Sequence, residues 1–314
     1  MDMRVGVLMG GRSLERDVSL RSGRRVSRAL AELGHEVLDL DVDESLVPTL
    51  KRERPDLVYI ALHGKFGEDG TVQELLEILD IPFTGPGVFA SALGFNKALS
   101  KEVFRSRGIP TPPYFVLSEA TFREMGALHA LHPAGEKLGF PLVVKPVAQG
   151  SALGIKVARS QEELPEAVRT ALHYDDRVLL EKYVKGTEVA ASIIGNLDLQ
   201  ALPLVEAVPR GEFFDFESRY TPGLTDYYCP ARLDEAVTRR AVEVALDTHL
   251  ALGCANVSRV DMIIDEDGVP QVLELNISPG MTETSLLPMA AEVAGMGFTE
   301  LVGRLVDLAL EKYS

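Results

Sequence analysis

Two apolar, β-favouring segments separated by Asp267-Gly268 constrain the fold of this chain more than any other feature. The dipeptide tolerates positive φ and suits a two-residue hairpin turn, which would place residue 266 opposite residue 269. The sequence therefore predicts an antiparallel hairpin whose pairing can be counted outward from the turn. In that register one face carries a row of side chains typical of core packing: Val260, Met262, Ile264, Leu273 and Leu275.

The other face of the predicted hairpin carries polar side chains. Asp261 faces Glu274 and Arg259 faces Asn276 in the counted register, and side chains alternate along a strand, so all four project together. Facing carboxylates repel unless a cation lies between them, and oxygen ligands suit Mg²⁺, which also takes waters and phosphate oxygens. The adjacent arginine could stabilise a negative charge that develops during a reaction. A solvated charged face is the alternative, but the apolar flanks and the turn at 278–280 favour a metal–phosphate site.

The charge of the chain limits its partners. The 314 residues carry a formal net charge of −15, which argues against a nucleic acid or an anionic membrane surface as partner, whereas a few local cations can still hold a nucleotide phosphate. The two cysteines, Cys229 and Cys254, lack metal-site spacing and suggest buried thiols in a reducing compartment. The sequence shows neither a signal-peptide layout nor an apolar stretch of membrane-spanning length, so we expect a cytoplasmic protein.

The first third of the chain alternates strand and helix patterns. The expected strands are 4–9, 37–40 and 57–62, and the expected helices are 14–33 and 72–79, followed by an extended segment at 81–84. Such a βαβ series predicts an open, largely parallel sheet with ligands beyond the carboxyl ends of its strands, where the polar loops 10–17 and 63–71 fall.

The remaining two thirds have a mixed pattern. We expect strands near 114–117, 141–145, 155–159, 177–183 and 187–194, with helices at 96–107, 119–131, 161–172, 234–252 and 298–312, and an irregular aromatic stretch at 211–230. The fold class is therefore α/β with α+β elements. Chain length and the pattern breaks predict three domains at 1–95, 96–185 and 186–314.

Two further segments suggest a nucleotide site. An apolar strand ends in Lys145 and leads into a glycine-bracketed loop at 149–154, which can cover phosphates with its backbone N–H groups, although an ordinary loop fits equally well. The spacing of Glu181 and Glu188 could serve an adenine amino group and ribose hydroxyls. For that segment the residues alone favour a hairpin with solvated acids.

Isolated polar residues remain ambiguous by themselves. Lys97 and Lys101 lie one turn apart on a predicted helix, as surface lysines often do. His63, which follows an apolar strand, could be a general base or a hydrogen-bonded loop imidazole. Glu15 stands near a helix start, where an acid is favoured electrostatically in any case.

Taken together, these segments resemble the D-alanine–D-alanine ligases of the ATP-grasp superfamily. The matching motifs occur in order over nearly the whole chain, at 10–20, 61–71, 84–87, 96–97 and 259–286. Other ATP-grasp enzymes share the metal hairpin without the first two motifs. The resemblance implies a three-domain ATP-grasp fold with ATP between the central and C-terminal domains, and it implies a homodimer.

The resemblance also implies the ligands of the nucleotide. The implied ATP-binding residues are Lys97, Lys145, Ser151, Glu181, Tyr183, Val184, Glu188 and Arg219. The first two lysines would contact phosphates, Glu181 and the backbone at 183–184 the adenine, and Glu188 the ribose. Two Mg²⁺ ions, with Mn²⁺ as a substitute, would be held by Asp261, Glu274 and Asn276.

The implied reaction joins two D-alanine molecules for peptidoglycan precursors. Glu15 would hold the first ammonium, and the first carboxylate would take the γ-phosphate to give an acyl phosphate that the second amine attacks. The implied catalytic residues are Glu15, Ser151, Tyr220, Arg259 and Gly280, and the implied substrate-binding residues are Glu15, His63, Ser285 and Leu286. Arg259 and the Gly280 N–H would stabilise the tetrahedral oxyanion. Ser151 and Tyr220 would meet Glu15 to hold two lids closed against water.

The chain departs from the family pattern at the expected lids. Ala152 stands where a second serine is common, and Phe214, Phe216 and Arg219 replace two tyrosines and a lysine. These changes concern lid closure and the choice of acceptor. A ligase of mixed specificity is therefore an alternative, although Tyr220 argues against a depsipeptide ligase.

Two other classes of protein fit the sequence less well. A catalytically silent nucleotide- or amino-acid-binding protein is opposed by the complete polar set on the hairpin. A Rossmann dehydrogenase lacks support because no GxGxxG motif follows the first strand.

Overall fold

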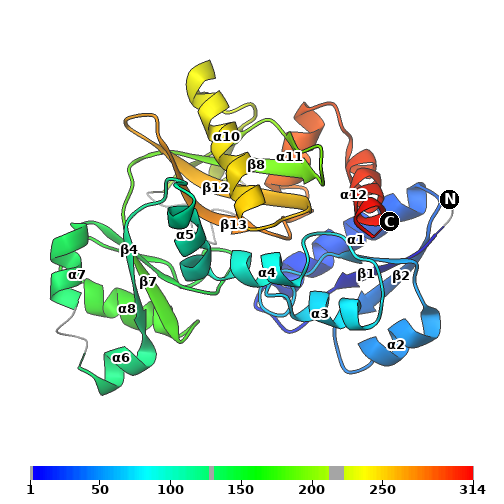
Figure 1. Cartoon of the computed structure of the whole chain (residues 1–314), viewed down its shortest axis with the longest axis horizontal. Helices are drawn as coiled ribbons and strands as arrows, with labels where there is room; N and C mark the ends of the chain where they lie inside the picture. The colour runs from blue at the N-terminus through cyan, green and yellow to red at the C-terminus, as the bar shows by residue number, and fades with distance from the viewer. Residues whose placement is uncertain (1–2, 127–130, 212–222, 314) are drawn as a thin grey trace.

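The computed structural model describes residues 3–126, 131–211 and 223–313, which form three sheets with helices packed on them (Figure 1). The first sheet is parallel, with β1 (Arg4–Met9) between β2 (Glu36–Asp41) and β3 (Leu57–Ile60). It is accompanied by α1 (Arg16–Glu32), α2 (Leu46–Glu53) and α3 (Thr71–Ile78). The predicted parallel sheet is confirmed, and the loops after β1 and β3 leave from the same edge.

The second sheet is antiparallel and has four strands in the order β4-β7-β5-β6. These strands are β4 (Tyr114–Ser118), β5 (Leu142–Pro146), β6 (Lys156–Ala158) and β7 (Arg177–Lys182). The accompanying helices are α6 (Glu119–Glu124), α7 (Leu131–Leu138) and α8 (Leu164–Leu172). The single helix expected over 119–131 is wrong, because α6 ends at Glu124.

The third sheet has six antiparallel strands, with β12 between β8 and β13. The strands are β8 (Gly186–Gly195), β9 (Gln200–Ala201), β10 (Val205–Pro209), β11 (Thr225–Tyr228), β12 (Asn256–Asp265) and β13 (Pro270–Asn276). Helix α10 (Glu235–Ala251) packs on this sheet. The stretch expected to be irregular at 211–230 thus contains a strand, β11, within its described part.

Four helices tie the sheets together. Helices α4 (Val88–Phe95) and α5 (Lys97–Ser106) contact β13, and the Asn96 side chain caps α5 by accepting from the Leu99 N–H at 3.1 Å. Helices α11 (Leu286–Val293) and α12 (Phe298–Lys312) close the chain, and α12 lies beside α1 (Figure 1). One apolar core consequently joins the N-terminal sheet to the C-terminal helices. The division into three domains remains a prediction.

The hairpin β12–β13 differs from the counted register near its turn. Three residues, 266–268, form the loop, with Gly268 at φ +72° and the Asp265 N–H bonded to the Val269 carbonyl at 3.0 Å. The two-residue turn is therefore wrong, and so is the pairing of 266 with 269. A bulge at Leu273 then shifts the register, so that Asp261 does face Glu274. Because of this bulge Val272, and not Leu273, shares the buried face with Leu275.

Within the described ranges, no helix is both long and apolar enough to cross a membrane.

Candidate active site

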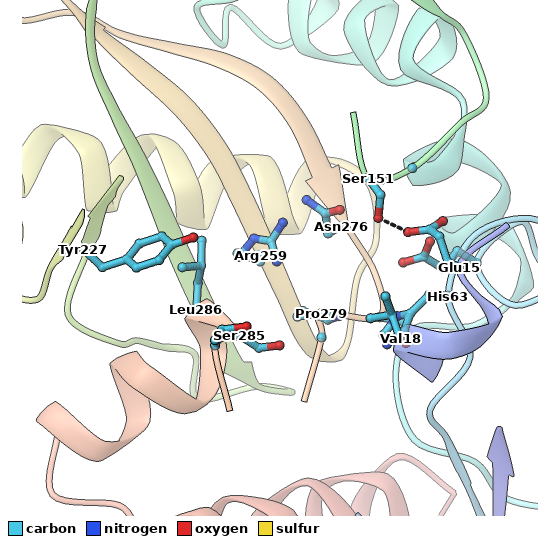
Figure 2. Close-up of a pocket in the computed structure, with 15 residues that line it drawn as sticks. Glu15, Val18, His63, Ser151, Tyr227, Arg259, Asn276, Pro279, Ser285 and Leu286 are labelled. Atoms are coloured by element: carbon cyan, nitrogen blue, oxygen red, sulfur yellow. Dashed lines mark hydrogen bonds between the residues drawn. The ribbon is translucent and has the colours of Figure 1, made fainter. Parts of the chain in front are cut away.

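One pocket gathers residues from all three parts of the sequence (Figure 2). Eight of the predicted site residues line it: Glu15, His63, Ser151, Arg259, Asn276, Gly280, Ser285 and Leu286. In Figure 2, Arg259 lies between Tyr227 at one end and Glu15 at the other. The sequence motifs, which are up to 271 positions apart, thus converge on one place.

Glu15 marks the first end of this pocket. It occupies the N-cap position of α1, is buried, and accepts a hydrogen bond at Oε1 from the Ser151 hydroxyl of the 149–154 loop. Two glycines make this contact sterically feasible. A Cβ at Gly150 would lie 2.7 Å from Glu15 Oε2, and one at Gly64, whose φ is +73°, would lie 2.4 Å from the same atom. The loop therefore meets the N-terminal sheet directly at Glu15.

Glu68 is a buried pocket residue that the sequence reasoning left without a role, although it lies inside the 61–71 motif. Its Oε2 accepts a hydrogen bond from the Gly64 N–H at 2.7 Å. Burial, and then the negative charge of Glu15, raise the pKa of Glu68 well above its usual value. A positively charged amine bound beside these two acids would offset the repulsion between them.

His63 is neutral in this environment. Burial, together with the positive charge of Arg259, lowers its pKa to about 4, although a backbone hydrogen bond at Ser278 acts in the opposite direction. Its Nε2 lies 3.1 Å from the Ser22 hydroxyl. Ser22 also accepts a hydrogen bond from the Met281 N–H at 3.2 Å, so it connects the imidazole to the 279–285 loop. A neutral imidazole held in this way can order a substrate without adding charge.

The predicted metal ligands are paired with protein cations. Arg259 donates from Nε and Nη2 to Asp261 at 2.7 and 2.8 Å, and Asn276 Nδ2 lies 3.1 Å from Asp261 Oδ2. Lys97 Nζ lies 3.0 Å from Glu274 Oε2 and donates to the Gln149 carbonyl at 2.7 Å. The positions next to Asp261 and Glu274 are thus places where positive charge is favoured.

The donor set fits Mg²⁺ better than a metal bound entirely by protein. The described residues contain no group of three His, Cys, Asp or Glu side chains placed to hold an ion. Asp261 and Glu274 are two carboxylates on paired positions, and Asn276 adds an amide oxygen. Mg²⁺ commonly uses one or two carboxylates and completes its shell with water and substrate phosphates.

A second set of buried charges is centred on Glu181. Glu181 lies between Lys145, at 2.6 Å from its Oε2, and Lys101, at 2.5 Å from its Oε1. Burial would raise the pKa of Glu181, but the two ammonium groups outweigh it and the pKa is lowered. The sequence offered no sign that Lys101 is buried, because its partner is 80 positions away.

The remaining predicted residues fall elsewhere. Tyr183, Val184 and Glu188 line a separate pocket against β10. Lys97 and Glu274 line a crevice that shares Glu68, Gly150 and Asn276 with the first pocket. Arg219 and Tyr220, with Phe214 and Phe216, lie outside the described residues. Tyr227 of β11 lines the main pocket, and the sequence reasoning missed it because it assigned no strand there.

The loop at the far end of the pocket is tightly braced. Ser285 is the N-cap residue of α11, and its Oγ accepts from the Thr282 N–H at 3.0 Å. A Cβ at Gly280 would lie 2.7 Å from the same hydroxyl, so a glycine is needed for this approach. Arg25 donates to the carbonyls of Met281 and Thr282 at 3.1 and 2.9 Å. The backbone at 280–282 is therefore fixed beside Arg259.

Three sheets of this topology, with a glycine-bracketed loop beside a crevice lined by Lys97, Glu68 and Glu274, belong to the ATP-grasp class of fold. The family models for the N-terminus and C-terminus of D-Ala–D-Ala ligase match residues 43–86 and 103–307. The chain belongs to the D-alanine–D-alanine ligase family. The predicted family and fold class are confirmed.

Individual relatives are similar over their whole length. The D-alanine–D-alanine ligase of Desulforamulus reducens is 47% identical, over 99% of this chain and 100% of its own. The crystal structure of the Bacillus anthracis D-alanine–D-alanine ligase complexed with ATP is 34% identical, with a TM-score of 0.83 and 98% of each chain covered. The VanG D-Ala:D-Ser ligase of Enterococcus faecalis is 28% identical, with a TM-score of 0.83, over 98% of this chain and 100% of its own.

Proposed function

We propose that this protein uses ATP to join two D-alanine molecules into D-alanyl-D-alanine for peptidoglycan precursors, with release of ADP and phosphate. One observation carries the proposal: Arg259 lines one pocket with Glu15 and Ser151, and its partner Asp261 faces Glu274 across the β12–β13 pair. Full-length similarity to curated D-alanine–D-alanine ligases supports the choice of substrate.

The first D-alanine would bind with its ammonium at Glu15. The neighbouring Glu68 has a raised pKa partly because Glu15 is negative, and an ammonium between them would offset that repulsion. Neutral His63 would order the same substrate without competing for its charge. The first carboxylate oxygen would then attack the γ-phosphorus of ATP, its bond to ADP would break, and a D-alanyl phosphate would form.

Asp261, Glu274 and Asn276 would hold Mg²⁺. Bound there, the ion would supply positive charge that offsets the charge of the phosphate oxygens. The two carboxylates would at the same time release the cations that now pair with them. Arg259 and Lys97 lie within hydrogen-bonding distance of those carboxylates, so they would be free to turn toward substrate oxygens.

The second step would be attack of the second D-alanine amine on the acyl carbon. Negative charge would develop on the acyl oxygen, where the Arg259 guanidinium and the Gly280 N–H would stabilise it. Phosphate would leave as the peptide bond forms. Ser285 and Leu286, at the start of α11, would hold the second carboxylate.

Water must be excluded because an acyl phosphate hydrolyses readily. The Ser151 hydrogen bond to Glu15 supports closure of the 149–154 loop over the first substrate. Lys97 would reinforce this closure through the Gln149 carbonyl. In the expected nucleotide site, Lys145 would contact phosphate, Glu181 and the backbone at 183–184 the adenine, and Glu188 the ribose.

The test is product identity. The purified protein with ATP, Mg²⁺ and D-alanine should release phosphate and D-alanyl-D-alanine in equal amounts, and chelation of Mg²⁺ should stop both. Phosphate release without any dipeptide from D-amino acids would refute the proposal.

A mixed-specificity ligase is the second candidate, because the chain is also similar to a D-Ala:D-Ser ligase structure. Replacing the acceptor D-alanine with D-serine or D-lactate across a pH series distinguishes the two. The homodimer and the cytoplasmic location remain predictions.

A further inference from the structure

Helix α5 directs two buried lysines to two different acids of the site. Lys97 and Lys101 lie one turn apart, with 6% and 0% of their surface exposed. Lys97 reaches Glu274 on β13, at the end of the site where the metal is expected. Lys101 reaches Glu181 on β7, at the end where the base is expected. The mechanism proposed above uses Lys97 and leaves Lys101 without a role.

The ammonium of Lys101 lies among three fixed oxygen atoms. It lies 2.5 Å from Glu181 Oε1, 2.5 Å from Thr111 Oγ1 and 3.3 Å from the Val272 carbonyl. Thr111 is itself held by a hydrogen bond to the Val272 carbonyl at 2.7 Å. The contacts with Thr111 and the Val272 carbonyl are hydrogen bonds, and the contact with Glu181 is an ion pair. Lys101 is therefore fixed in place and not available to turn toward a phosphate.

Lys145 differs from Lys101 because its expected partner is a phosphate of the nucleotide. It now lies 2.6 Å from Glu181 Oε2, but the proposed function gives it a phosphate oxygen as ligand. When Lys145 turns to phosphate, Glu181 loses one of its two cations while it stays buried. A buried carboxylate without a cation tends to take up a proton. The Lys101 contact prevents this because it remains when Lys145 leaves.

We propose that Lys101 is a positioning residue, which keeps Glu181 ionised and fixed as a hydrogen-bond acceptor and so selects a 6-amino purine over a 6-oxo purine. This inference rests on the proposed function, in which Glu181 contacts the adenine. An ionised carboxylate accepts a hydrogen bond from the amino group of adenine. It repels the carbonyl oxygen of hypoxanthine or guanine, whereas a protonated carboxyl group can donate to that oxygen.

The experiment compares ATP with inosine triphosphate as the nucleotide of the ligation reaction. The variant Lys101→Met keeps the length of the side chain and removes its charge. We expect the ratio of kcat/KM for ATP to that for inosine triphosphate to fall about tenfold or more, because a hydrogen bond to a charged group is lost. The change should appear mainly in the nucleotide KM, and the KM for D-alanine should stay the same. Lys101→Arg, which keeps the charge, should restore part of the ratio.

Lys312→Met is the matched control. Lys312 is a partly buried lysine, with its Nζ 3.0 Å from the Gly85 carbonyl and 4.2 Å from the centre of the Phe83 ring. Its substitution should lower stability and leave the nucleotide ratio unchanged. If Lys101→Met does not fold, Thr111→Val removes one acceptor of the same ammonium and should lower the ratio in the same direction by a smaller factor.

Two results would overturn the inference: a ratio within twofold of wild type in the substituted proteins that fold, or an equal fall in Lys312→Met. Failure of the proposed function is separately visible, since wild-type protein would then form no dipeptide. In that case, calorimetric binding of ADP and inosine diphosphate still measures the effect of Lys101. Loss of ADP preference in Lys101→Met would support the inference, and an unchanged preference would overturn it.

Discussion

Arg259 offers the sharpest test of the site because it serves both the fold and the proposed chemistry. Its guanidinium donates two hydrogen bonds to Asp261, at 2.7 and 2.8 Å, and the two side chains are only 11% and 8% exposed. Arg259→Met keeps the apolar stem and leaves the Asp261 carboxylate with the Asn276 amide at 3.1 Å. Removing one partner of a buried pair commonly costs about 3–5 kcal/mol. We expect the free energy of unfolding to fall by about 3 kcal/mol, the lower end of that range.

The same substitution should separate catalysis from nucleotide binding. Loss of one oxyanion donor typically lowers kcat by a factor of about 10² to 10³. The KM for ATP should not rise, because Asp261 without its arginine becomes a freer ligand for Mg²⁺. Binding of Mg²⁺ and ATP to the folded state should then restore part of the lost stability, about 2.7 kcal/mol when the free ligand is at 100 times its dissociation constant.

The assays are urea unfolding with and without Mg²⁺ and ATP, and dipeptide formation at saturating D-alanine. Arg259→Lys is the matched control, because it keeps the charge but loses the two-pronged geometry, and it should fall between wild type and Arg259→Met. A kcat within tenfold of wild type for Arg259→Met would refute the oxyanion role. Loss of stabilisation by Mg²⁺ and ATP would show that Arg259 acts in nucleotide binding.

Three further predictions concern the same pocket. Burial lowers the folded-state pKa of His63 to about 4, so the unfolded chain takes up a proton near pH 6.5 before the folded chain does. The contribution of His63 to the free energy of unfolding is therefore fully present above pH 6.5, and the free energy of unfolding falls by up to about 3 kcal/mol toward pH 4. His63→Gln should remove this part of the pH dependence of urea unfolding, and an unchanged slope would contradict the burial argument. Ser151→Ala removes the hydroxyl that bonds Glu15, so phosphate release per dipeptide should rise severalfold; strict one-to-one coupling would show that this contact does not exclude water. Gly280→Ala would place a Cβ 2.7 Å from Ser285 Oγ, and its effect on the KM of the second D-alanine should shrink in a Ser285→Ala background; equal effects in both backgrounds would exclude that clash.

Elements whose pattern is local were predictable from the sequence. β1 (Arg4–Met9) and α12 (Phe298–Lys312) begin and end where hydrophobic periodicity places them. α5 begins at Lys97 because Asn96 supplies a cap that is visible in the sequence. In such cases the signal and the structure involve the same few residues.

Elements that depend on distant packing were missed. α4 (Val88–Phe95) follows Gly85-Pro86-Gly87, which indicates a break, and its apolar residues show little helical periodicity. It packs closely against β13 and the residue that follows it, since a Cβ at Gly94 would lie 2.8 Å from Ile277 Cγ2. Burial of Lys101 belongs to the same category, since only the folded chain brings Glu181 to it. A sequence pattern cannot indicate a partner that the fold alone supplies.

The hairpin shows how a correct site can follow from an incorrect turn. Counting from a two-residue turn put Asp261 opposite Glu274, and that pair is correct, but the loop has one residue more and the bulge at Leu273 takes up the difference. An uninterrupted strand would place Val272 and Glu274 on one face, which would expose the valine or bury the acid. The bulge lets Val272 pack in the core while Glu274 faces the site. The adjacent apolar pair Val272-Leu273 was the available signal, because strict alternation does not produce two neighbouring apolar residues on a one-sided strand.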